Sequence, residues 1–375
     1  MSLNKQFIRI VLSFLHGLML LFLLLLINQT SWSADSDESL FEYIEKIENI
    51  FTTPTIPSNL VFINTAKDID LLNDPEEPGK LTITDRKSLA EFFKLLSDNG
   101  NEHAYVLCDV FFEYPAPGDS LVEERLVRCK RVIFPSHFVK GKYKKPCIDV
   151  FSGLADIGTY TGTLSRFQLT YKDTLKTIPL LMAETLGARS LSGGSFHLST
   201  ITPRYYITAS DLENSGNIQV YSLGNLLNLC RKDDSFFKTY LSNKIFIIGD
   251  LENNTSLTPM GNSYSPLILF NVYLSLINGR DKINMWWLLI CLVLLTAASY
   301  ILFYKEISPP KSVKPWVNFV LISFVNKFFS FLGICLVLAI ISELFSTLIS
   351  ISLLVGYFTL VSTIINYYRE NYSKK

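Results

Sequence analysis

Charged residues are scarce in this chain of 375 amino acids: only 18% are Asp, Glu, Lys or Arg, and the formal net charge is zero. A nucleic-acid-binding protein needs a basic surface that displaces counterions from phosphates, so the composition argues against that class. The chain also lacks a G-x-G-x-x-G motif, a P-loop and a CxxC pair. We therefore expect no dinucleotide or other cofactor and no structural metal site.

The zero net charge is the sum of two unequal parts. Residues 29–283 carry 25 Lys or Arg and 31 Asp or Glu, whereas the rest of the chain carries 9 bases and 3 acids. An acidic middle between basic, apolar ends is typical of a membrane protein.

Long apolar runs predict four membrane spans. Residues 1–28 form an N-terminal anchor with an 18-residue apolar core at 10–27, and residues 284–304 form a second span that begins with Trp286 and Trp287. Residues 316–368 are too long for one span of about 20 residues and predict two, with a turn near Ser342 and Glu343. The first run also resembles a cleavable signal peptide, because small residues follow it at Ser31, Ser33 and Ala34; this alternative stays open.

Basic residues predict the orientation of these spans. They precede the first span, follow the second and close the chain in the tail 369–375: Lys5, Arg9, Lys305, Lys311, Lys314, Arg369, Lys374 and Lys375. Because positive residues favour the cytoplasmic side, both termini are expected in the cytoplasm and residues 29–283 outside it.

The middle region predicts an α/β domain. Apolar, β-branched runs at residues 60–64, 104–110, 131–134 and 244–249 are typical of buried strands, and 205–208 is a further possible strand. Amphipathic helices are expected between them, at 35–50, 85–96, 119–130, 177–186, 223–241 and 267–276. Buried strands that alternate with helices indicate a mostly parallel sheet with helices on both faces.

Polar residues at the predicted strand ends are the candidate ligand-binding residues. In parallel sheets ligands bind beyond the carboxyl ends of the strands, and those positions hold Asp68, Asp70, Asp109, His137 and Asp250. Four carboxylates and an imidazole are also compatible with a metal-dependent hydrolase, but Asp is common at strand ends because it caps turns. We therefore treat the five as candidate pocket residues and do not expect an enzyme.

Two smaller features complete the outer domain. Cys129 and Cys147 flank a basic stretch and can pair in an oxidising compartment, although the spacing leaves this open. The four lysines between 140 and 145 are expected at a solvated hairpin tip, with anionic lipid or a polyanion as the alternative contact.

The layout resembles proteins built on the second type of CHASE domain, a bacterial extracellular sensory module. Several segments match that family in order: LVFINTAKDID at 60–70, Arg86 to Leu96, LCDVFFEYP at 107–115, KIFIIGD at 244–250 and LFNVYLSLING at 269–279. The three closing spans also follow the family pattern. The family's "G…HA" is replaced by Pro266, Phe270 and Asn271. Because only a short tail follows the last predicted span, we expect no cytoplasmic output domain.

The resemblance implies a bacterial inner-membrane protein whose outer domain senses an unknown extracytoplasmic ligand. Without an output domain, such a sensor is expected to signal through a separate membrane or cytoplasmic protein partner. The alternative is a structural or assembly subunit of a cell-envelope complex, in which the α/β domain serves only as an interaction surface.

Overall fold

The computed structural model describes most of the chain, and its contacts divide it into two compact units. The described residues are 2–28, 56–73, 79–156, 164, 166–171, 174–187, 197–214, 218–233, 235–283, 285–304, 333, 337–338 and 351–372. The helical unit comprises Met1–Ile44, Gly194–Thr202 and Arg280–Lys375; the α/β unit comprises Glu45–Gly193 and Pro203–Gly279.

A mostly parallel sheet forms the centre of the α/β unit. Among the described residues its strands lie in the order β12-β1-β13-β4-β5-β6, and β7 also pairs with β5. All of these pairings are parallel except that of β5 with β6. The strands are β1 (Leu60–Asn64), β4 (Tyr105–Cys108), β5 (Val132–Val139), β6 (Lys142–Lys144), β7 (Ser152–Leu154), β12 (Gln219–Ser222) and β13 (Ile245–Gly249). The predicted α/β class is therefore confirmed.

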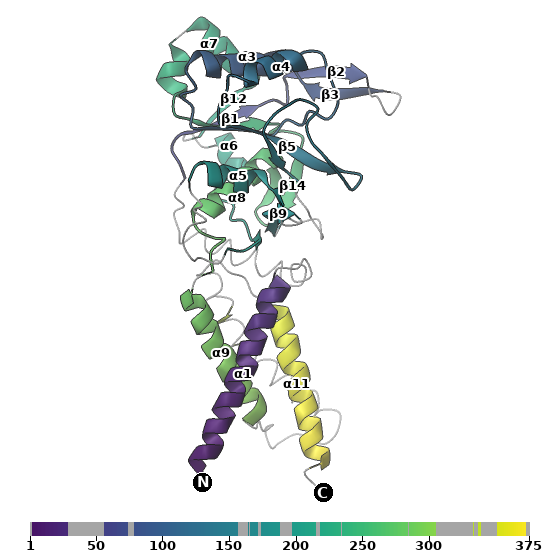
Figure 1. Ribbon diagram of the computed structural model, residues 1–375, viewed down its shortest axis with the longest axis vertical. Coiled ribbons are helices and arrows are strands. Elements are labelled where there is room, and N and C mark those ends of the chain that lie inside the picture. The colour runs from purple at the N-terminus through teal and green to yellow at the C-terminus, as the bar shows by residue number, and fades with distance from the viewer. Residues whose placement is uncertain are drawn as a thin grey trace. The chain divides into compact units, whose positions relative to one another are not determined.

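Helices cover both faces of this sheet, as Figure 1 shows, with α3, α4 and α7 on one side and α5, α6 and α8 on the other. These helices are α3 (Arg86–Asp98), α4 (Asp119–Leu126), α5 (Ile178–Thr185), α6 (Ala209–Asn214), α7 (Leu223–Lys232) and α8 (Ser265–Ile277).

Alternation along β1 explains the two-sided core. Val61 and Ile63 are fully buried with the apolar residues of α3 and α7, whereas Phe62 points to the other face, where its ring meets Phe270 of α8 edge-on at 6.1 Å. A strand buried on both faces needs apolar residues at nearly every position, and the run LVFIN fits this pattern.

Short hairpins and one irregular turn decorate the unit. β2 (Ile69–Asn73) pairs with β3 (Lys80–Thr84), β9 (Thr170–Tyr171) with β10 (Leu175–Lys176), and β14 (Thr255–Thr258) with β15 (Gly261–Tyr264), all antiparallel. A π-helical turn spans Phe237–Leu241, and β8 (Phe167–Gln168) is a two-residue strand. The two-residue strand β11 (Thr200–Ile201) belongs to the helical unit.

Several predicted boundaries are wrong. The third predicted strand does not end at Phe134 but continues to Val139, which places His137 inside β5 rather than after it. Residues 205–208 form no strand, and the helix predicted to reach Leu241 ends at Lys232. The edge strand β12 was not predicted. The predicted helix at 35–50 lies outside the described residues.

The cysteines and the basic stretch have plain roles. Cys129 and Cys147 are free; the Cys129 thiol lies 3.2 Å from the Phe93 carbonyl oxygen, and no disulfide joins the two cysteines. Lys140 and Gly141 form the turn between β5 and β6, so the lysine-rich stretch is a hairpin tip.

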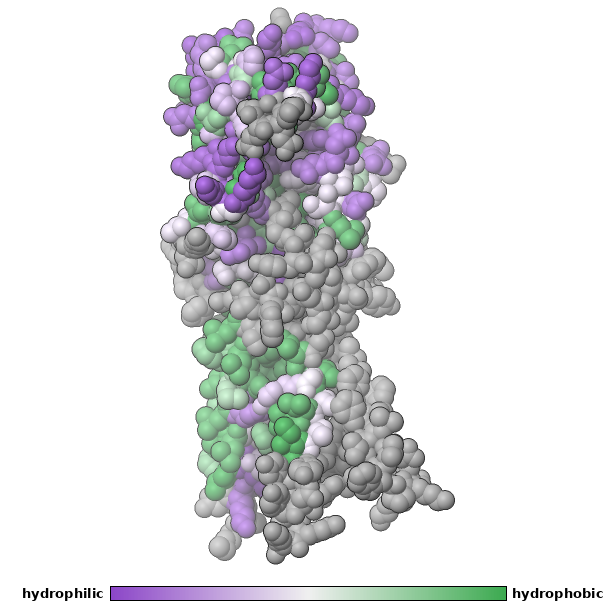
Figure 2. Space-filling view, turned by 90° about the vertical axis from the view of Figure 1, so that its right-hand side faces the viewer, coloured by the Kyte–Doolittle hydropathy of each residue, from purple (hydrophilic) through white to green (hydrophobic). Residues whose placement is uncertain are grey.

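The helical unit contains α1 (Ser2–Asn28), α9 (Met285–Tyr304) and α11 (Ile351–Tyr372). Among the described residues, two helical segments are long and apolar enough to cross a membrane, Lys5–Leu26 and Met285–Tyr304. α11 covers part of the predicted fourth span, while most of 316–350 lies outside the described residues. In Figure 2 the described residues of the helical unit are mainly hydrophobic, and those of the α/β unit are mainly hydrophilic.

Candidate functional site

The carboxyl edge of the parallel sheet brings some of the five candidate residues together and separates others. Asp109 directly follows β4, and its backbone N–H donates to the Ile248 carbonyl at 2.7 Å. Since Leu107 pairs with Ile133, the register places Asp109 and His137 on the same face of the sheet, towards α8. The electrostatic influence of His137 on the Asp109 carboxyl agrees with this placement.

The other three candidates have local structural roles. One Asp68 carboxyl oxygen accepts the Gly224 N–H at 3.0 Å, at the start of α7. Asp250 accepts the N–H groups of Glu252 and Asn253, at 2.8 and 2.9 Å, and so closes its own turn. Asp70 is exposed on β2, where its carboxyl contacts Asp85.

The Asp109 carboxyl is enclosed by the start of α8. The Ser265 hydroxyl lowers the pKa of this carboxyl as a hydrogen-bonding neighbour, and a side chain on Gly249 would place its Cβ 3.3 Å from the Asp109 Cβ and 3.0 Å from Pro266. Burial raises the pKa of Asp109, while the bond from Ser265 and the charge of His137 oppose that rise. Gly249 is therefore part of the site, because it leaves the room in which this carboxyl sits.

His137 is held by a second carboxylate that sequence reasoning missed. Its Nδ1 lies 2.8 Å from Asp156 Oδ1, and Asp156 Oδ2 accepts the Phe138 N–H at 2.7 Å. The Phe111 ring meets the imidazole edge-on at 4.7 Å. Both side chains of the His137–Asp156 pair are 29% exposed, so the imidazole is fixed in orientation yet reachable from solvent.

We call Asp109, His137, Asp156 and Ser265 the strand-end cluster. It offers two carboxyl groups, an imidazole and a hydroxyl on one face of the sheet, which suits a ligand rich in hydrogen-bond donors. No group of His, Cys, Asp or Glu in the described part of the chain is arranged to hold a metal ion. Ser265 and Asp156 escaped the sequence analysis because each follows a segment, β15 or β7, whose strand was not recognised.

Asp109→Asn is expected to raise the stability of the α/β unit relative to the native chain as the pH increases from 4 to 8. The raised folded-state pKa means that the native carboxyl stabilises the fold fully only below the unfolded value of 3.8. That stabilisation is lost as the pH rises through the folded pKa. Urea unfolding of both chains across this pH range measures the difference.

Asp85→Ala is expected to change stability with the opposite pH dependence. Desolvation raises the pKa of Asp85, but hydrogen bonds from the Ser88 hydroxyl and from the Lys87 and Ser88 N–H groups outweigh it and lower the pKa overall. Loss of this N-cap should cost about 1 kcal/mol at neutral pH, and less as the pH falls below 4. The same pH trend in both variants would contradict the assignment of Asp109.

Comparisons with known proteins give no family for this chain: no protein-family model, no curated protein and no solved structure matches it.

Proposed function

We propose that this protein is a membrane-anchored sensor of the bacterial inner membrane whose α/β unit binds a small polar ligand outside the cytoplasm. The strand-end cluster is the observation that carries the proposal. It lies at the carboxyl edge of a parallel sheet, where ligands of α/β domains bind, and it combines a partly buried carboxyl of raised pKa with an accessible imidazole.

The proposed membrane arrangement has four spans, both termini in the cytoplasm and residues 29–283 outside. The two apolar helices and the basic residues at Lys5, Arg9 and Lys305 support it. Within the helical unit, Figure 1 also draws the amino end of α1 and the carboxyl end of α11 at the same end.

The resemblance to CHASE domains of the second type is part of this proposal. It is supported by the succession β1, α3, β4, α4 and β5, and by β13 followed by α8, which carry the segments that resemble the family. We propose that ligand binding shifts the packing of the membrane helices and that a separate membrane or cytoplasmic protein receives the signal.

A role as an assembly subunit of an envelope complex is the second candidate. The observation that favours it is an exposed apolar surface on the α/β unit, where the side chains of Val127 and Phe151 are 86% and 55% exposed. Apolar residues exposed together on an otherwise polar domain are typical of interaction surfaces.

Thermal unfolding of the full chain in lipid nanodiscs tests the sensor proposal. We would screen primary amines, polyols and sugars at millimolar concentration, because the cluster is rich in acceptors. A ligand at one hundred times its Kd should add about 2.7 kcal/mol of stability. Asp109→Asn and His137→Phe should abolish that response.

Asp250→Asn is the matched control, because the amide oxygen can still accept the N–H groups that the Asp250 carboxylate accepts in its turn. It should respond like the native chain. A screen without any stabilising compound, or a response that survives Asp109→Asn, would overturn the proposal.

A further inference from the structure

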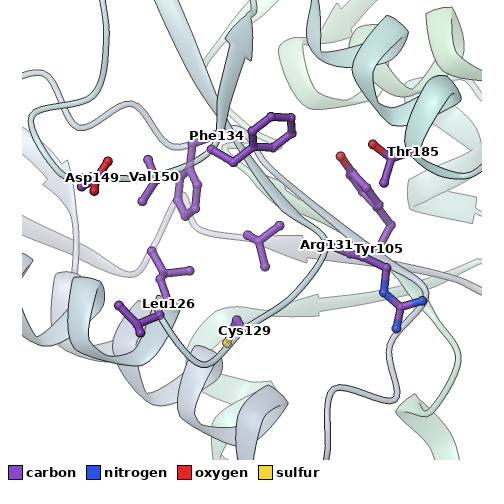
Figure 3. A pocket seen from close by; sticks show the side chains of 11 residues that line it. Tyr105, Leu126, Cys129, Arg131, Phe134, Asp149, Val150 and Thr185 are labelled. Carbon is purple, nitrogen blue, oxygen red and sulfur yellow. The ribbon is translucent and has the colours of Figure 1, made fainter.

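A pocket opens at the opposite, amino-terminal edge of the sheet from the strand-end cluster. Its volume is about 420 Å³, within the range of small-molecule sites. It lies where β4 and β5 begin, between the end of α4 and the segment that leads into β7 (Figure 3). The apolar part of its wall is made by Leu126, Val127, Val132, Phe134, Val150 and Phe151.

The apolar wall has buried residues at its base and exposed residues at its rim. Phe134 and Val132 are buried in the sheet, and the Phe134 N–H donates to the Phe151 carbonyl at 3.0 Å. Val127 and Phe151 are the exposed residues noted above, and they flank the opening. A preformed floor with an exposed apolar rim favours a ligand that has an apolar group to bury.

Two opposite charges line the same pocket, and Figure 3 places Arg131 and Asp149 on opposite sides of the apolar residues. One Nη of Arg131 donates to the Asn101 carbonyl at 3.0 Å, which orients the guanidinium, and no other described residue hydrogen-bonds to its remaining N–H groups. The backbone N–H of Asp149 is fixed by Glu123 Oε1 at 2.9 Å, while no described residue pairs with the Asp149 carboxylate.

The pocket lining also includes a buried tyrosine. Tyr105 is 1% exposed, and its hydroxyl points toward Thr185 (Figure 3) but makes no hydrogen bond of normal geometry to a described residue. The Thr185 hydroxyl donates to the Leu181 carbonyl at 2.7 Å and can still accept from Tyr105. Burial raises the pKa of Tyr105 to about 12, so the hydroxyl keeps its proton at any physiological pH.

We propose that this pocket binds a short peptide with an apolar side chain and two free ends. The peptide carboxylate would pair with Arg131, the ammonium with Asp149, and the apolar side chain would lie against Phe134 and Val150. A cation and an anion on opposite sides of an apolar wall complement a zwitterion with an apolar body.

Isothermal titration of the full chain in nanodiscs with the tripeptide Ala-Leu-Ala tests the proposal, with empty nanodiscs as the blank. We expect saturable binding that weakens at least tenfold when the tripeptide is C-amidated, and several-fold when it is N-acetylated. Arg131→Asn should weaken binding of the free tripeptide at least tenfold and should leave binding of the amidated tripeptide unchanged. Asn is chosen because Arg131 has a φ of 56°, a backbone conformation that Asn tolerates.

Three further variants complete the design. Asp149→Asn should reproduce the effect of N-acetylation without touching the strained position. Arg128→Ala, an exposed base on the same stretch but outside the lining, should bind normally. Asp109→Asn should also bind normally, so the result is independent of the strand-end cluster. Absence of saturable heat, equal binding of free and doubly capped tripeptide, or binding only of a folded partner protein would overturn the proposal.

Discussion

Asp119→Ala is expected to lower the free energy of unfolding of the α/β unit by about 3–5 kcal/mol, because it leaves a buried positive charge without its partner. Arg86 is only 1% exposed, its Nε lies 3.2 Å from Asp119 Oδ1, and its guanidinium stacks 3.6 Å from the centre of the Phe112 ring. Burial lowers the pKa of Arg86 while Asp119 raises it, and an arginine stays charged in either case.

The local backbone is built around this ion pair. Gly118 has a φ of 99°, and a Cβ there would lie 2.9 Å from the Arg86 Cβ, so glycine is required at the start of α4. The second Asp119 oxygen accepts the Ala116 N–H at 2.7 Å. Asp119→Asn keeps an acceptor for that N–H but removes the charge. It should therefore show most of the drop in the free energy of unfolding that is expected for Asp119→Ala.

Alkylation of Cys108 during urea unfolding measures the effect, because this thiol is fully buried in β4 and becomes reactive only when the unit unfolds. Replacing both partners, as Arg86→Met with Asp119→Leu, should cost less than Asp119→Ala alone. The exposed pair of Lys176 and Glu184 is the control, since Lys176→Met should change stability by no more than about 1 kcal/mol. A loss below about 1 kcal/mol for Asp119→Ala would show that the charge is not buried as described.

The sequence was sufficient to predict those strands and helices whose own residues form a clear apolar pattern. β1 and β13 were predictable because each is a short continuous apolar run, and α3 because Asp85 caps a helix with one apolar face. β12 was missed for the converse reason: QVYS has no apolar run, and its strand conformation comes from parallel pairing with β1, a partner more than 150 residues earlier in the chain. Non-local pairing of this kind leaves no local pattern.

The predicted third strand ends one residue before Pro135, whereas β5 continues through it. Pro135 follows the apolar run RVIF, and a proline normally ends a central strand because it cannot donate to the ladder. Beyond Ile133, however, β5 pairs with β7 instead of β4, with Pro135 opposite Gly153. The strand therefore continues and carries His137 to Asp156, a pairing between segments 19 residues apart that residue order alone did not reveal.

Gly17→Leu is expected to separate α1 from α9. A Cβ at Gly17 would lie 2.9 Å from both the backbone nitrogen and the Oγ1 of Thr296, so the helices touch where no side chain fits. The neighbouring His16 bridges three helices: its Nδ1 lies 2.8 Å from the Ser299 hydroxyl, and its Nε2 lies 2.8 Å from the Tyr357 hydroxyl. Small residues and polar bridges of this kind hold membrane helices together, because lipid provides no hydrophobic drive for their association.

Disulfide cross-linking measures that separation. The pairs Arg9–Tyr304, His16–Ser299 and Gly17–Thr296 set an antiparallel register for α1 and α9. Position 21 and the native Cys291 lie about one turn further along this register and share one buried cluster, so Leu21→Cys should cross-link to Cys291. Adding Gly17→Leu should reduce the yield several-fold. His16→Leu should reduce it less, since an interhelical hydrogen bond in a membrane contributes only about 0.6–2 kcal/mol.

Gly356→Leu on α11 is the matched control, because no atom of the described residues lies within 4 Å of a Cβ at Gly356. It should leave the yield unchanged, and an equal loss in both variants would contradict the close approach at Gly17. The mass of the mature protein decides how the first predicted span is used. A cleaved signal peptide has no reason to pack against α9 and α11, so a mature protein whose mass includes α1 is expected. If α1 is retained, membrane helices both precede and follow residues 29–283. In the proposed sensor, a ligand-induced change in residues 29–283 would then act on helices that are already in contact.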